Sequence, residues 1–120
     1  MSLIRVSQAK GRVPVTVFHL QDRVNLGNTA ELEQAAREAY EAGMRNLVIH
    51  LSEAPSLTSA GIRAIVSLHK LLMKDESDPS TKHLKLVSPT SHVREILDIA
   101  GVSEHIDIYD ELDEAVASFG

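Results

Sequence analysis

Short apolar segments that alternate with helical stripes are the feature that most limits how this chain can fold. Two stretches near the start, residues 2–8 and 13–20, alternate apolar and polar side chains as strands do. A turn at residues 9–12 separates them, with Gly11 available for a positive φ. Three later apolar runs, at residues 46–51, 83–87 and 105–109, lie between stretches whose apolar residues recur every three to four positions.

Strands that alternate with helices form mostly parallel sheets with right-handed crossovers. The order ββαβαβαβα therefore predicts an α/β fold with a mostly parallel, mixed central sheet and four helices. The chain shows no internal repeat and no linker, so we expect one domain over residues 1–120.

Capping residues and glycines predict the ends of the helices. Gly43 and Gly101 are placed to end the first and third helices. The residues that predict helix starts are Asn28 (with Glu31 at capping-box spacing), Ser59 or Ala60, Ser88 before Pro89, and Asp110. The residues expected to face inward from the second helix are Ile62, Ile65, Val66, His69, Leu72 and Met73.

Composition narrows the classes of function. The chain has no cysteine, which excludes a disulfide scaffold, a cysteine nucleophile and a thiolate metal site. Its six histidines include no i,i+4 pair, and no nucleophile elbow or phosphate-binding loop is present. A net charge of −5 argues against nucleic acid, and no apolar run reaches the ~18 residues that cross a bilayer. We therefore expect a cytoplasmic, non-enzymatic domain that holds no cofactor or metal and does not insert into a membrane.

The negative charge is concentrated in the second half of the chain. Residues 1–60 carry six basic and six acidic side chains, whereas residues 61–120 carry six basic and eleven acidic ones. Seven of these acidic residues lie between Asp98 and Glu114, with no Lys or Arg among them. Such a stretch is typical of a solvated helical face, and the alternative is a surface that steers a basic partner.

The stretch Leu57–Arg63 follows a buried strand and opens a helix, at the sheet edge where functional groups collect in open α/β folds. Ser59 is expected at or beside the N-cap, where simple capping stabilises by about 0.5–2 kcal/mol. The same place tolerates a phosphate, because a helix N-terminus offers unpaired N–H groups and positive partial charge. Gly61 leaves room for close approach to the serine. Both roles of Ser59, cap and phosphate acceptor, stay open on these grounds.

With these residues in view, the chain from about Ile4 to Phe119 resembles the STAS family, and within it the bacterial anti-sigma factor antagonists. The resemblance includes the order of elements, the strand Val48–Leu51 and the motif of residues 57–63 at the start of a helix. It continues through residues 86–89 and 93–101.

The resemblance implies partner switching in transcription regulation. In that family an anti-sigma factor that is also a serine kinase phosphorylates a serine at the start of the second helix. The unphosphorylated form binds the kinase and frees the sigma factor, and a metal-dependent serine phosphatase resets the switch. ATP and metal would thus belong to these partners.

Ser59 matches the family's phosphoacceptor serine. Thr58 is the alternative acceptor, because it supplies a second hydroxyl where many members have Asp. Asn25 matches a loop position that often carries Asp, and His50 ends the third strand where Asp or Asn is frequent. The residues expected to bind the partner are Asn25, Leu57, Thr58, Ser59, Ala60, Gly61, Ile62 and Arg63.

A second hypothesis is a STAS interaction or ligand-binding module that is not phosphorylated, such as a subunit of a transport or signalling complex. In that case Ser59 only caps its helix.

Overall fold

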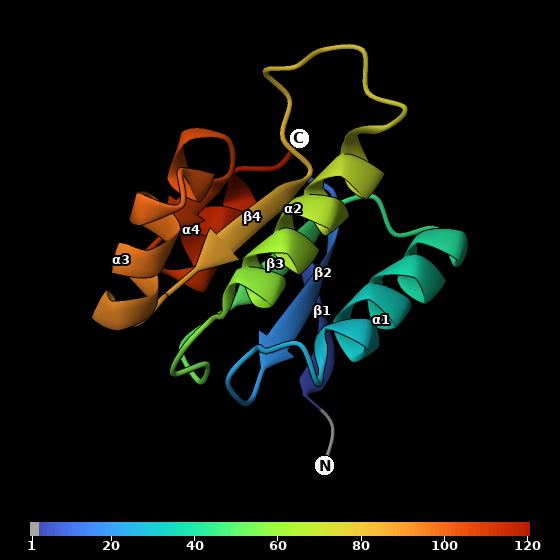
Figure 1. Ribbon diagram of the computed structural model, residues 1–120. Coiled ribbons are helices and arrows are strands. Elements are labelled where there is room, and N and C mark those ends of the chain that lie inside the picture. Colours follow the sequence, from blue (N-terminus) through green and yellow to red (C-terminus); the bar gives the residue numbers. More distant parts are fainter. Residues whose placement is uncertain (1–2) are drawn as a thin grey trace.

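The computed structural model describes residues 3–120 (Figure 1). Residue 2, at the expected start of the first strand, lies outside the described residues. The strands are β1 (Ile4–Lys10), β2 (Pro14–Leu20), β3 (Leu47–His50), β4 (Leu84–Val87) and β5 (Asp107–Tyr109). The helices are α1 (Thr29–Glu41), α2 (Ser59–Met73), α3 (Ser91–Ile99) and α4 (Leu112–Ala117), with a 3-10 turn at Val102–Glu104. The predicted order ββαβαβαβα is confirmed.

The five strands form one mixed sheet in the order β1-β2-β3-β4-β5. The β1–β2 hairpin is antiparallel, with Ile4 opposite Leu20, and every later neighbour pairs in parallel. Helices α1, α2 and α3 cover one face of the sheet, while α4 lies on the other (Figure 1). This arrangement confirms the mostly parallel sheet that the alternation of strands and helices predicts.

Alternate residues of the strands feed two separate cores. In β3, Leu47 and Ile49 join the larger core beneath α1, α2 and α3, whereas Val48 joins the smaller core beneath α4. All three side chains are fully buried, which is why this short strand reads as a nearly continuous apolar run.

Gly43 ends the first helical segment with φ 112°, as predicted. Gly11 has no positive φ, so that expectation was wrong. Glycine is needed at this position because a larger residue has no room: a Cβ there would lie 2.8 Å from the carbonyl oxygen of Val116. Ala9 and Lys10, expected in the turn, are the last residues of β1.

The capping box expected at α1 is absent. Asn28 occupies the N-cap, but its side chain accepts from the backbone N–H of Asn25 at 2.9 Å and donates to the carbonyl of Arg23. Glu31 accepts a hydrogen bond from the backbone N–H of Leu3, in a distant segment. Asn28 therefore bonds within its own loop, and Glu31 bonds to a distant segment.

The starts of the last two helices also differ from prediction. Ser88 has φ 54° and donates its hydroxyl to the carbonyl of Asp110, while Thr90 caps α3 by accepting from the Val93 N–H at 3.1 Å. Helix α4 has Glu111, not Asp110, at its N-cap, without a side-chain capping bond.

The buried face of α2 is rotated from the predicted one. Ile65 and Leu72 are buried as expected. Ile62, Val66, His69 and Met73 are only partly buried, although Ile62 and Val66 do pack against the larger core. The fully buried residues of α2 are Gly61, Ala64, Ile65, Leu68 and Leu72. Small residues on this face let α2 approach its neighbours closely, and the larger ones lie on its flank.

Among the helices of residues 3–120, none is both long and apolar enough to cross a bilayer.

Candidate partner-binding site

Two loops meet at the carboxyl end of the parallel strands, at the lower edge of Figure 1. One joins β2 to α1 and the other joins β3 to α2. Val24 of the first pairs with Leu57 of the second in an isolated parallel bridge. The Val24 N–H donates to the carbonyl of Ser56 at 3.0 Å, and the Thr58 N–H donates to the carbonyl of Val24 at 2.9 Å. The start of α2 is therefore tied to the neighbouring loop by backbone hydrogen bonds.

Thr58, rather than Ser59, is the N-cap of α2. Its hydroxyl accepts from the Gly61 N–H at 3.3 Å and donates to the carbonyl of Val24 at 3.3 Å. The threonine hydroxyl thus both caps the helix and attaches the helix to the loop.

Ser59 is the first residue of α2, and its side chain is exposed. Among residues 3–120, no group hydrogen-bonds to its hydroxyl. The first turn of α2 contains no acidic residue, and Arg63 lies exposed one turn further on. A serine in this position is open to an enzyme, and a phosphate on it would meet the positive end of the helix.

Leu57 and Gly61 shape the surface from beneath. Leu57 is only 5% exposed and belongs to the larger core. A Cβ on Gly61 would lie 3.0 Å from both the carbonyl oxygen and Cγ1 of Val24, so the glycine lets the helix and the loop approach. The expected partner-binding residues that are at least partly exposed are Asn25, Thr58, Ala60, Ile62, Arg63 and Ser59.

Asn25 organises the loop beside Ser59. Its side-chain oxygen accepts from the Gly27 N–H at 2.8 Å, and its carbonyl accepts from the N–H groups of Asn28 and Thr29. The next residue, Leu26, is 79% exposed. Leu26 was not among the predicted partner-binding residues, although a single large apolar residue in a polar loop is a signal for such a role.

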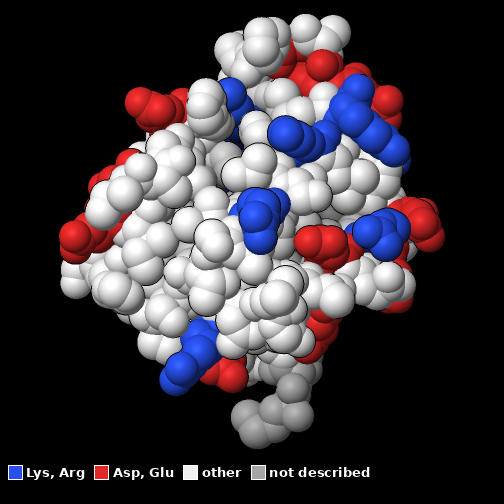
Figure 2. Space-filling model, in the orientation of Figure 1, with Lys and Arg blue, Asp and Glu red and all other residues white. Residues whose placement is uncertain are grey.

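The surface around Ser59 carries little charge. Residues 24–30 and 54–69 contain Arg63 as their one formally charged side chain. Figure 2, in the same orientation as Figure 1, shows a broad area over α2 and toward α3 that is uncharged except for a basic side chain near its centre, with acidic and basic groups at its margins. One added phosphate would therefore reverse the local charge.

His50 also lies at the carboxyl end of the parallel strands, but on the face of the sheet opposite the Ser59 surface. Helix α4 covers that face only in part. Its ring stacks on that of His19 with 5.2 Å between the centroids. Hydrogen bonds fix both rings: Ser7 Oγ lies 2.9 Å from Nε2 of His19, and Ser52 Oγ lies 3.2 Å from Nδ1 of His50. This pair is therefore separate from the surface around Ser59.

Burial lowers the pKa of both stacked histidines below 6.5. Arg5 lowers the pKa of His19 and of His50 further, whereas Glu53 opposes the shift in each. Burial also lowers the pKa of His69, with help from Lys82 and His105.

We expect acidification from pH 7 to pH 5 to lower the melting temperature. As the pH falls, the unfolded chain takes up protons on these histidines before the folded chain does. The neutral histidines therefore contribute fully to stability above pH 6.5, and this contribution is lost as the pH falls through the lower pKa values of the folded chain. Thermal melts at several pH values would measure this, and His50→Gln should flatten the slope. A melting temperature that is constant or rises toward pH 5 would contradict the lowered pKa values of these histidines.

A scan against protein families finds that the STAS domain model matches residues 7–115. The chain belongs to the STAS domain family. A curated relative of this STAS domain is the Bordetella bronchiseptica protein BtrV, named as an anti-sigma factor antagonist. It is 28% identical over 100 residues, covering 83% of this chain and 82% of BtrV.

Solved structures share the fold. An anti-sigma factor antagonist from Mycobacterium paratuberculosis superposes with a TM-score of 0.80 and 22% identity, over 96% of this chain and 91% of the other. The Bacillus cell fate determinant SpoIIAA, in its phosphorylated form, superposes with a TM-score of 0.69 and 10% identity, over 94% and 96%. The murine anion transporter Slc26a9 contains a similar fold, with a TM-score of 0.67 and 18% identity, over 85% of this chain and 17% of the transporter.

Residues 3–120 contain no group of three or more His, Cys, Asp or Glu side chains that could hold a metal ion.

Proposed function

We propose that this STAS domain is an anti-sigma factor antagonist that works by binding and not by catalysis. In its unmodified form it binds an anti-sigma factor that is also a serine kinase. Phosphorylation of Ser59 by that kinase releases it, and a metal-dependent serine phosphatase restores it. The name of the relative BtrV and the match of residues 7–115 to the STAS domain model support this proposal.

The observation that carries the proposal is the contrast between two adjacent hydroxyls. That of Ser59 is exposed and makes no hydrogen bond within residues 3–120. That of Thr58 caps α2 and attaches it to Val24. A kinase could modify Ser59 without breaking a hydrogen bond of its hydroxyl within residues 3–120, whereas modification of Thr58 would remove a cap worth about 1 kcal/mol.

Charge explains how one phosphate would act. It adds roughly −1.5 to −2 charges at neutral pH, next to a surface whose one formal charge is Arg63. The helix N-terminus stabilises that charge within the domain. A partner that packs against this surface would have to remove water from the charged phosphate. The free-energy cost of that desolvation favours release of the partner.

Phosphorylation by the cognate kinase tests the acceptor. After incubation with kinase and ATP, the wild-type chain should gain one phosphate by intact mass and shift fully on a phosphate-retarding gel. Ser59→Ala should gain none. Thr58→Asn keeps a capping side chain but removes the second hydroxyl, and it should gain one phosphate as the wild type does. A phosphate that persists in Ser59→Ala and disappears in Thr58→Asn would move the acceptor to Thr58.

The fold shared with Slc26a9 supports a second candidate, an unphosphorylated module of a transport complex. Co-purification of this chain with a membrane transporter, without phosphate by intact mass, would favour it. Co-purification with a kinase would favour the switch.

A further inference from the structure

A cavity of about 450 Å³ lies between α2 and the segment that joins α3 to β5. Its floor is apolar, formed by Ile62 and Val66 on the flank of α2 and by Val102 and Ile106 on the other side. These α2 side chains are the ones that the sequence predicts to be inward but that the core leaves partly exposed. The volume falls within the range of roughly 300–1,000 Å³ that small-molecule sites occupy.

The rim of this cavity is basic. Lys70, Lys82, His69 and His105 line it, and no Asp or Glu is among its lining residues. The carboxylate of Glu104 lies beside Gly101, which is one of the lining residues. A cluster of basic groups around an apolar floor is unusual on a chain with a net charge of −5, and it matches an anion with an apolar body.

His69 adds a separate observation. Its Nδ1 atom is buried and has no hydrogen-bond partner among residues 3–120. Buried polar atoms are normally paired, so this nitrogen would pair with a group bound in the cavity only if the His69 ring rotates. Burial is the largest cause of the lowered pKa of His69, and Lys82 and His105, which line the same cavity, lower it further.

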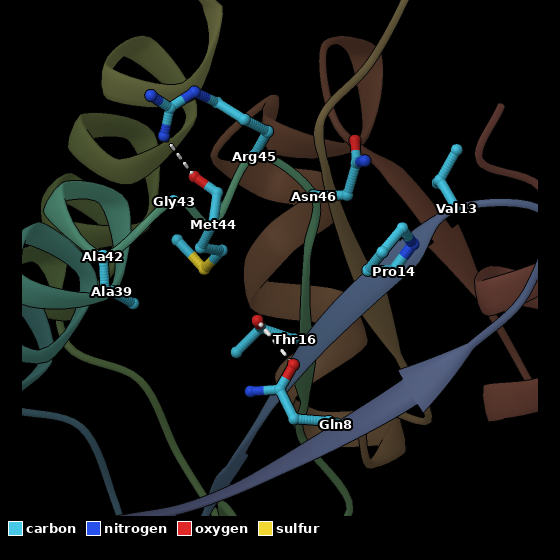
Figure 3. Close-up of a pocket in the computed structure, with 10 residues that line it drawn as sticks. All are labelled: Gln8, Val13, Pro14, Thr16, Ala39, Ala42, Gly43, Met44, Arg45 and Asn46. Carbon is cyan, nitrogen blue, oxygen red and sulfur yellow. Dashed lines mark hydrogen bonds between the residues drawn. The ribbon is translucent and has the colours of Figure 1, made fainter.

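A larger cavity lies at the amino end of the parallel strands, opposite the end where Ser59 lies, and it lacks these features. It is lined by the hairpin and the end of α1 and has a volume of about 570 Å³ (Figure 3). Its polar groups are already paired: the Thr16 hydroxyl donates to the side-chain oxygen of Gln8, and Arg45 donates to the carbonyls of Tyr40 and Met44. The view shows the Arg45 side chain held over the Met44 carbonyl.

We propose that the cavity between α2 and residues 100–106 binds a small amphipathic anion, a carboxylate with an aliphatic body. The body lies on Val66, Val102 and Ile106, and the carboxylate meets Lys70 and Lys82. This site is independent of the phosphorylation of Ser59. It adjoins the candidate partner surface through Ile62, which lies three residues after Ser59 on α2.

Decanoate is the probe for this site, with decan-1-ol as the uncharged and decyltrimethylammonium as the cationic control. Titration of the full chain, followed by amide NMR signals, should show saturable binding of decanoate with the largest shifts at Val66, Gly101 and Val102. Both controls should bind at least about tenfold more weakly, because neither can make the charge-assisted contact with the lysines. Equal binding of decanol, or shifts centred elsewhere, would overturn the proposal.

Charge reversal supplies the matched variants. Lys70→Glu with Lys82→Glu should weaken decanoate binding at least about tenfold. Lys10→Glu, an equal change per residue on the distant strand β1, should leave binding unchanged, and Glu104→Gln should strengthen it. Melting temperatures confirm that each variant is folded. If Lys10→Glu weakens decanoate binding as much as the double variant does, then decanoate is attracted by the overall charge of the protein and the cavity is not a specific site.

Discussion

Ser59→Asp should weaken binding to the anti-sigma kinase at least about tenfold, equivalent to about 1.4 kcal/mol. The reason is electrostatic: a carboxylate at the exposed start of α2 must be desolvated when a partner packs against this nearly uncharged surface. The fold itself should not suffer, because a negative charge in the first turn of a helix stabilises it by about 0.3–1 kcal/mol. Calorimetric titration of the kinase with each variant measures the effect.

Ser59→Asn is the matched control, since asparagine has nearly the shape of aspartate and no charge. Its affinity for the kinase should stay near that of Ser59→Ala, well above that of Ser59→Asp. If the Asn and Asp variants bind equally weakly, bulk and not charge excludes the partner, and the electrostatic account of release is wrong.

Phe119→Ala should lower the free energy of unfolding by about 3–5 kcal/mol. Phe119 is 2% exposed and packs in the smaller core, where α4 and the residues that follow it cover one face of the sheet. The ring also lies 4.6 Å from Nζ of Lys85, a lysine that is only 6% exposed. Truncation therefore leaves both a cavity and a buried cation with less favourable surroundings. Chemical denaturation measures the change.

Leu26→Ala is the opposite case and serves as a control. Leu26 is 79% exposed, so its removal should change stability by no more than about 0.5 kcal/mol. Because it adjoins the loop that holds Thr58, the same substitution should reduce kinase affinity. A destabilisation by Leu26→Ala comparable to that of Phe119→Ala would mean that this loop is packed in solution in a way the structure does not show.

Periodicity was sufficient to predict the order of strands and helices. The apolar runs and helical stripes are properties of whole segments, and burial on one or both faces of the sheet imposes them directly. Gly43 was predictable for the same reason: its left-handed conformation is a local requirement that a glycine meets at little cost.

Capping was less predictable because distant segments compete for the capping side chains. Glu31 accepts from Leu3, and Ser88 donates to Asp110 across the sheet edge. Neither partner is near in sequence, so a local motif could not reveal them.

At the candidate site the motif predicted the position of the helix start but not the division of roles within it. Thr58 takes the cap because its hydroxyl reaches both the Gly61 N–H and the carbonyl of Val24, whereas the Ser59 hydroxyl makes no hydrogen bond within residues 3–120. The contribution of Val24 depends on the bridge between two loops, which the sequence alone does not indicate.

The affinity of the kinase for the phosphorylated chain tests the central claim most directly. The chain carrying one phosphate, located on Ser59 by tandem mass spectrometry and separated from the unmodified chain, would be titrated against the same kinase as the unmodified chain. The account predicts that the phosphate weakens binding at least about tenfold while both forms have similar melting temperatures. Equal affinities for the two forms would contradict it.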